Sequence, residues 1–150
     1  MSSTAGGSPG VRRWAARRVG AFRTVDRMAQ LITTPHRIPV PGGKVINEYV
    51  GRVASGTEHV SVARMEAPPG WDEPAQRPEF DEVTLVLSGE VVVSHDGGQT
   101  RVAAGQAVHT RAGERVRYSV GPDGARYVAI CVPAFSPQTV HRDDEEVARD

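Results

Sequence analysis

The sequence has few of the features that would place it outside a reducing cell interior. Cys131 is its only cysteine, which excludes an intramolecular disulfide and favours a cytoplasmic location. No apolar run has the length needed to span a membrane, and the basic head lacks the continuous apolar core of a secretory signal. Lysines plus arginines equal acidic residues at 18 each, so no global field favours nucleic acid or a membrane surface as a partner.

Common catalytic signatures are also missing. We find no internal repeat, phosphate-binding loop, dinucleotide-binding fingerprint, nucleophile elbow or Cys/His zinc spacing. These absences remove most of the common enzyme classes. The length of 150 residues suits one domain with a core of reasonable size.

The balanced charge conceals an asymmetry between the head of the chain and the remainder. Residues 1–27 carry six arginines and one acidic residue. We expect residues 1–34 to form a flexible basic extension, disordered at first and helix-forming over 11–32. It resembles a transit peptide, a membrane-surface arm or a nucleic-acid arm, or it is an extension before a natural start at Met28.

What the rest of the sequence contains is a series of short β-rich segments with turn signals between them. Their spacing of about ten residues favours an all-β barrel or sandwich. Glycine-rich segments at 96–98 and 121–124 predict turns. The predicted strands cover residues 45–53, 59–65, 82–88, 90–95, 101–102, 107–111, 116–120 and 127–132.

A loop punctuated by proline and glycine leads into an apolar strand that begins at Glu82. Strand alternation places Glu82, Thr84 and Val86 on one face of this strand. A carboxylate on so apolar a strand either sits at a rim or takes part in chemistry. Glu82 is therefore the leading site candidate.

The spacing around this strand resembles the two sequence motifs of the cupin superfamily. Glu82 is followed by Gly89 after six residues, as in the first motif, and Gly105 with the turn at 111–113 matches the frame of the second. The resemblance covers residues 45–133 and implies an all-β fold, a single cupin (double-stranded β-helix or jelly-roll) barrel. We place that barrel at residues 35–141 and a charged tail at 142–150.

The histidines that usually bind metal in this family are absent from the matching positions. Of the usual four ligands only Glu82 is present, and the three histidine positions fall at Ala75 and Arg77 or Gln76 and Pro78, and at Val116. The resemblance therefore implies a cupin barrel without the usual metal site, and we expect no metal and no other cofactor. The region around Glu82 is also similar to the cupins found with ethanolamine-utilisation genes.

Three residues are candidates for catalysis. Burial inside a barrel would raise the pKa of Glu82, which could then exchange a proton; the alternative is a rim carboxylate paired to an arginine such as Arg77. Tyr118 lies on the strand face that would carry the missing histidine, where it offers a hydroxyl or simply fills the barrel. His109 points inward as an acid or base, or lies on the outer face.

Six further residues are candidates for ligand binding. Gln76 and Arg77 would hydrogen-bond an anionic or carbonyl group. Val116 and Val120 share the strand face of Tyr118. Trp71 and Phe80 flank the loop over the barrel mouth, either as a lid or as pins that hold the loop to the barrel.

Three functions remain open at this point. The first is a small-molecule binder, acting as a metal-independent proton-transfer enzyme of isomerase, lyase or cyclase type in sugar or natural-product metabolism. The second is a metal-dependent dioxygenase or isomerase with ligands from Glu82, Gln76 and His109. The third is a non-catalytic sensor or assembly module. We expect a homodimer formed through outer sheet faces and an exchanged edge strand at 45–53.

Overall fold

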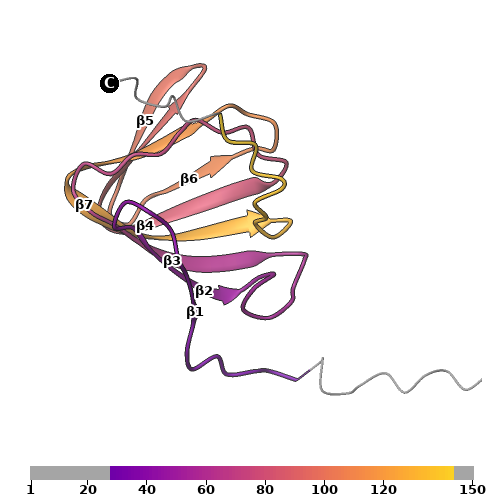
Figure 1. Cartoon of the computed structure of the whole chain (residues 1–150). Helices are drawn as coiled ribbons and strands as arrows, with labels where there is room; N and C mark the ends of the chain where they lie inside the picture. The colour runs from indigo at the N-terminus through magenta and orange to yellow at the C-terminus, as the bar shows by residue number, and fades with distance from the viewer. Residues whose placement is uncertain (1–27, 144–150) are drawn as a thin grey trace, which may run out of the picture. The chain divides into compact units, whose positions relative to one another are not determined.

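The computed structural model describes residues 28–143, so the expectations for residues 1–27 and for the tail from residue 144 lie outside it. The described part forms seven strands and no helix, and thus no helix that could cross a membrane. Figure 1 shows the strands, which are β1 (His36–Ile38), β2 (Val45–Val50), β3 (Ser61–Ala67), β4 (Asp81–His95), β5 (Gly98–Ala103), β6 (Ala107–Thr110) and β7 (Arg117–Val132).

All strand pairs are antiparallel, in the order β1-β2-β3-β7-β4-β5, with β6 also paired to β4. The long strands β4 and β7 pair twice. Residues 81–89 of β4 pair with 125–132 of β7, and 91–94 pair with 117–120. The two strands therefore run through both halves of a sheet that curves into a barrel (Figure 1). The prediction of an all-β cupin barrel is confirmed.

The bend between the two halves depends on a pair of glycines. Gly89 has φ of 76° and Gly124 has φ of 71°, a region that residues with a Cβ rarely adopt. A Cβ added at Gly89 would lie 2.1 Å from the carbonyl oxygen of Gly124, so both backbones need glycine to approach this closely. The turn predicted at 121–124 is therefore wrong, because these residues continue β7 through the bend.

β2 ends earlier than the predicted strand and is not an edge. Its C-terminal side turns at Gly51, where a Cβ would meet the Glu48 carboxylate at 2.6 Å. Glu48 Oε1 accepts hydrogen bonds from the amides of Val53 (3.1 Å) and Ala54 (2.9 Å). Because β2 pairs with both β1 and β3, it has no free edge. The prediction that residues 45–53 form an exchanged edge strand is not supported by this pairing.

The apolar core fills one end of the barrel. Thr84 and Val86 are buried, whereas Leu85 and Leu87 are 38% and 50% exposed, as the alternation along β4 predicted. The inward residues of β4, β5 and β7 pack together with one another. This cluster contains Val86, Val91, Val93, Val102, Val116, Tyr118, Val120, Ala125 and Tyr127.

A loop and the C-terminal segment form part of the wall at the other end. The loop bridges to β7 through Asp72 with Ser119 and to Val116, just before β7, through Gln76, which also bridges to Arg142. The Asp143 amide donates to the Ala75 carbonyl at 2.8 Å. The loop and the C-terminal segment thus lie beside β7 as further extended layers of the barrel wall.

Candidate functional site

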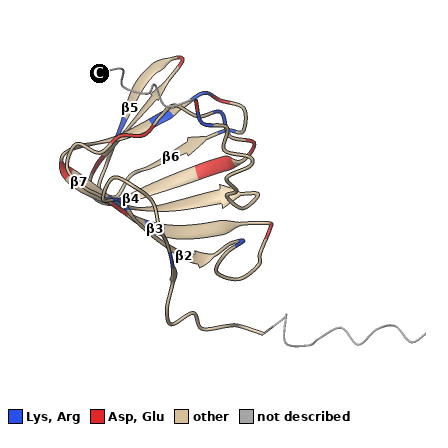
Figure 2. Cartoon of the chain, viewed as in Figure 1, with Lys and Arg blue, Asp and Glu red and all other residues tan. Residues whose placement is uncertain are grey.

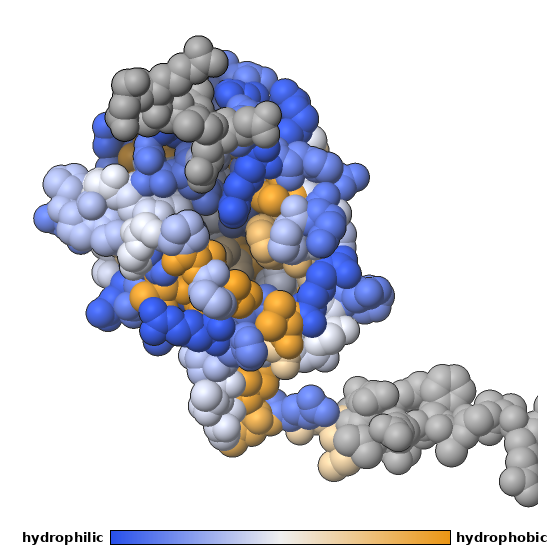
Figure 3. All heavy atoms as spheres, in the orientation of Figure 1, coloured by the Kyte–Doolittle hydropathy of each residue, from blue (hydrophilic) through white to orange (hydrophobic). Residues whose placement is uncertain are grey.

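A cavity of about 580 Å³ lies at the end of the barrel that the apolar core leaves open. Its volume is in the range of pockets that hold small molecules. The apolar part of its wall includes Ile46, Ala63, Met65, Ala129, Phe135 and Val140. The polar part includes Lys44, Glu48, Glu73, Gln76, Glu82 and Arg142. In Figure 3 this face of the molecule is hollowed near its centre, with apolar surface bordering the hollow.

Glu82 lies at the start of β4 and faces this cavity. It is flanked in the sheet by Thr110 of β6 and Cys131 of β7, and Figure 2 shows the acidic start of β4 as a red band. Burial raises its pKa to about 7, and the nearby Glu73 carboxylate adds to that rise. At neutral pH the carboxyl therefore exists in both protonation states, which a proton-transfer group requires.

Tyr118 stands behind Glu82 rather than in the cavity wall. It belongs to the apolar core, and its hydroxyl shares a hydrogen bond of 2.9 Å with Thr110 Oγ1. A hydrogen bond from the same hydroxyl lowers the pKa of Glu82, while burial raises the pKa of Tyr118 itself. Tyr118 therefore positions Glu82 and does not face a ligand.

Lys44, the only lysine in the sequence, supplies a cation to the cavity. Its Nζ lies 4.0 Å from the centre of the Trp71 ring and 5.6 Å from that of Tyr127, so two aromatic faces hold it. Burial lowers its pKa, against the opposing effect of Glu73 and Glu82. The Val120 amide donates to the Trp71 carbonyl at 2.9 Å, which holds the backbone of Trp71 against β7.

Glu73 and Arg142 complete what we call the charged cluster, defined as Lys44, Glu73, Glu82 and Arg142. Arg142 lies 4.0 Å from Glu73 Oε2, and the Glu73 side chain is 12% exposed. Burial raises the pKa of Glu73, whereas Lys44 and Arg142 lower it. Two acidic and two basic side chains thus share one partly desolvated space, and their charges act on the pKa values of Lys44, Glu73 and Glu82.

Gln76 contributes a buried amide to the same cavity. Its residue exposure is 4%, and its backbone makes two hydrogen bonds with Val116, of 2.8 and 2.9 Å. Its Oε1 has no hydrogen-bond partner among the residues that the structure describes. An unpaired buried acceptor costs about 1–3 kcal/mol, which a hydrogen-bond donor brought to Gln76 would offset.

Two predicted site residues lie outside the cavity. His109 is exposed on the outer face of β6, with Nε2 at 3.3 Å from Asp81 Oδ2. Of the two orientations expected from the sequence, the structure has the outer one, because the register pairs Glu82 with Thr110 and so turns the neighbouring His109 outward. Arg77 is exposed and donates to the Gly113 carbonyl at 2.8 Å. It holds a turn and neither binds in the cavity nor pairs with Glu82.

The remaining candidates serve packing. Val116 and Val120 are buried in the apolar core, so they support the cavity from behind. Phe80 is 2% exposed and packs edge-on against Phe135, with ring centres 5.7 Å apart. Phe80 therefore pins the C-terminal segment to β4 and does not close over the mouth.

The residues of the cavity do not fit the family's usual metal. No group of three or more His, Cys, Asp or Glu side chains within residues 28–143 is arranged to hold a metal ion. The Glu48 carboxylate is already engaged by backbone amides, and burial raises the pKa of the Cys131 thiol, so this thiol stays protonated. Borderline metals prefer imidazole or thiolate, and the imidazole that lines the cavity, that of His141, is exposed and has its Nε2 3.0 Å from Glu79 Oε2.

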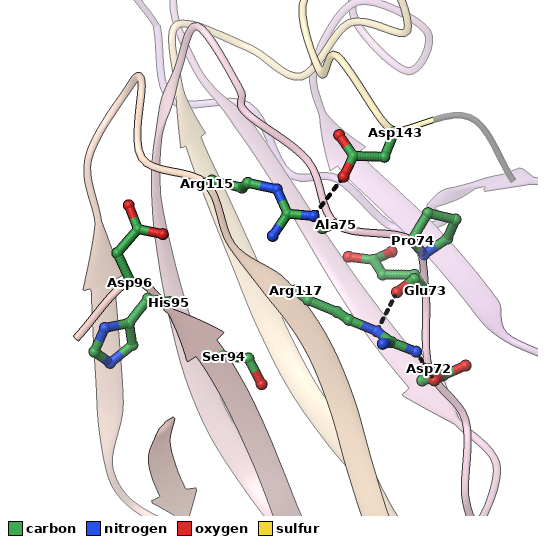
Figure 4. A pocket seen from close by; sticks show the side chains of 10 residues that line it. All are labelled: Asp72, Glu73, Pro74, Ala75, Ser94, His95, Asp96, Arg115, Arg117 and Asp143. Atoms are coloured by element: carbon green, nitrogen blue, oxygen red, sulfur yellow. Dashed lines mark hydrogen bonds and ion pairs between the residues drawn. The ribbon is translucent and has the colours of Figure 1, made fainter. Parts of the chain in front are cut away.

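A second hollow, of about 700 Å³, lies on the surface beside the loop that carries Glu73. Figure 4 shows its arginines already engaged: Arg115 pairs with Asp143 at 2.6 Å, and Arg117 pairs with Asp72. Because the carboxylates neutralise both arginines, this groove presents no free cation to a ligand. The barrel cavity is the stronger candidate site.

Comparisons with known proteins agree with this architecture. Residues 63–133 match the family model of the cupin domain, Cupin_2. The nucleoside dehydratase Pac13 of Streptomyces is similar in structure, with a TM-score of 0.61 and 16% identity over 77% of this chain and 90% of that one. EutQ, an ethanolamine utilization protein of Salmonella typhimurium, gives a TM-score of 0.50 and 20% identity over 61% and 71%.

One curated relative is closer in sequence. The Myxococcus xanthus protein named endoribonuclease YbeY is 49% identical over 105 residues, which are 69% of this chain and 36% of that protein. The chain thus spans about a third of the length of this relative. The match of residues 63–133 to the cupin domain and the barrel topology of the described residues agree with each other.

Proposed function

We propose that this cupin binds a small polar molecule in the barrel cavity and transfers a proton on it through Glu82. The observation that carries the proposal is a partly buried carboxyl, at the start of β4, that faces a cavity of about 580 Å³ and has a pKa of about 7. A group whose pKa matches the working pH is the most effective acid or base.

The charged cluster supports both halves of such a step. A carboxylate removes a proton from carbon or oxygen, and the positive charges of Lys44 and Arg142 stabilise negative charge that develops on the substrate. The protonated Glu82 can then return its proton to another atom, as in isomerisation, elimination or ring closure. These steps need no metal, in keeping with the donor set of the cavity.

The substrate class we propose is a polar ring compound such as a nucleoside or a sugar. The Streptomyces neighbour is a nucleoside dehydratase whose structures include uridine. Dehydration is an elimination that consumes a proton acceptor and a proton donor, and Glu82 can supply each in turn. The likeness of fold suggests the class, and the polar wall of the cavity agrees with it.

Deuterium exchange tests the proposal. The protein is incubated in D2O with uridine, thymidine, glucose 6-phosphate and fructose 6-phosphate, and NMR follows both C–H exchange and conversion. We expect exchange or conversion of at least one compound, slowed at least tenfold by Glu82→Gln. The proposal fails if no compound reacts, or if the variant is as fast as the parent.

A non-catalytic ligand-binding module is the second candidate. The chain spans 36% of the Myxococcus xanthus relative, and because one fold hosts many unrelated functions, the barrel by itself does not require catalysis. In that case a compound of the panel binds by calorimetry and none reacts. The metal-dependent reading is tested by elemental analysis, where about one zinc, iron, manganese or nickel per chain, with activity lost to a chelator, would replace our proposal.

A further inference from the structure

The most unusual polar atom in the cavity is Gln76 Oε1. Two buried side-chain oxygens of residues 28–143 lack a hydrogen-bond partner, and they are those of Gln76 and Thr84. Of the two, only Gln76 lines the cavity. Its backbone is fixed by the paired hydrogen bonds to Val116 and by the bridge to Arg142, so the residue is anchored beside the cavity.

A carboxamide presents an acceptor and a donor side by side in one plane. Its complement is a group with N–H next to C=O, as in lactams and imides, and glutamine reads base edges by the same two-point contact. We propose that Gln76 recognises the N–H and C=O edge of a cyclic amide or imide, such as a pyrimidine ring. The proposal rests on the proposed function, because it names the substrate class of the same cavity.

The remaining walls suit such a ring. Ile46, Met65 and Phe135 contribute apolar surface, against which a flat heterocycle can pack. The acidic Glu82 and the basic Arg142 line the same cavity. Hydrogen-bond donors and acceptors on the ring therefore both have a partner. Gln76 sets which edge faces the loop, and Glu82 then meets a different part of the molecule.

Calorimetry with uridine and 3-methyluridine tests this role, because methylation removes only the ring N–H. We expect the parent protein to bind uridine at least tenfold more tightly than the methylated compound. Gln76→Met, which keeps length but removes both polar atoms, should erase the difference. Gln99→Met, at an exposed glutamine of β5, is the matched control and should keep it.

Three results would overturn the inference: no binding of uridine at millimolar concentration, equal binding of the two compounds by the parent, or a preference that survives in Gln76→Met. The ligand pair alone decides the matter if that variant fails to fold. Glu82-dependent exchange on a sugar phosphate, without preference for uridine, would refute this inference and leave the proposed function intact. Preference for uridine without any exchange would support this inference and refute the proposed function.

Discussion

At the scale of single residues, the proposed chemistry depends on the carboxyl of Glu82, and the sequence predicted only part of its surroundings. Alternation along β4 predicted that Glu82 faces inward, and motif spacing identified Gln76. Lys44, Glu73 and Arg142 were missed, because they reach the cavity from three distant segments. The one usable signal was that Lys44 is the sole lysine, placed directly before an apolar strand.

Glu82→Gln should change stability in a pH-dependent way. The pKa of Glu82 is raised from 4.5 to about 7 on folding, so the folded state holds the proton more tightly than the unfolded state. The stability this provides is present below about pH 4.5 and is lost as the pH rises toward about 7. Gln mimics the protonated acid, so the variant should match the parent at low pH and exceed it at pH 8 by on the order of 2–3 kcal/mol.

Urea unfolding at pH 4.5 and pH 8 measures this difference directly. Glu66→Gln is the control, because Glu66 lies on the outer face, 3.7 Å from Arg126, where a charge contributes about 0–1 kcal/mol. A loss of stability in Glu82→Gln at pH 8 would mean that the ionised carboxylate is a structural anchor.

Lys44→Met should raise the apparent pKa of Glu82 further above 7. The positive charge of Lys44 lowers the pKa of both Glu82 and Glu73, and its removal leaves the two carboxyls less compensated. Titration of ¹³C-labelled carboxyl resonances follows the change, and Lys44→Arg, which keeps the charge, should restore the parental value. An unchanged Glu82 titration in Lys44→Met would show that the amine does not act on the carboxyl.

At the scale of elements, sequence reasoning found most strands but divided the two longest. Segments 82–88 and 90–95 are one strand, β4, and segments 116–120 and 127–132 fall mostly within β7. Glycine-rich sequence is read locally as a turn, yet here Gly89 and Gly124 let two strands bend together while staying paired. That contact joins residues far apart in the chain, so local propensity could not show it. Strand register cannot be read from local sequence either, so the sequence left open on which face of the sheet His109 lies.

Gly89→Ala should be among the most damaging single changes in the barrel. The new Cβ would lie 2.1 Å from the Gly124 carbonyl oxygen, at φ of 76°, so two paired backbones must separate. We expect a loss of about 3 kcal/mol or more, and Gly113→Ala as the control should lose only about 1 kcal/mol, since its φ is 86° but nothing lies within 4 Å. Denaturant unfolding compares them, and equal losses would show that conformation alone, without the contact, accounts for the effect.

At the scale of the whole molecule, the outer sheet face is the feature that the monomer leaves unexplained. Leu85, Leu87 and Val132 are 38%, 50% and 52% exposed, and all three lie on the paired strands β4 and β7. Partly buried apolar residues adjoin them in register, with Leu85 opposite Val128 and Val83 opposite Ile130. A contiguous apolar patch of this kind commonly marks an interface.

We propose that this face pairs with the same face of a second copy, as a two-fold axis requires for a self-complementary surface. Leu85→Lys places a charge at its centre, where burial without a partner is unfavourable, and should convert the dimer to a monomer in sedimentation velocity at micromolar concentration. Val53→Lys is the control, because Val53 is 57% exposed but lies in the turn after β2, and it should leave the dimer intact.

The inner cavity does not contact this face, so ligand binding by Leu85→Lys should stay within about twofold of the parent. The proposed interface is refuted if the parent protein sediments as a compact monomer, and the exposed leucines would then need another explanation.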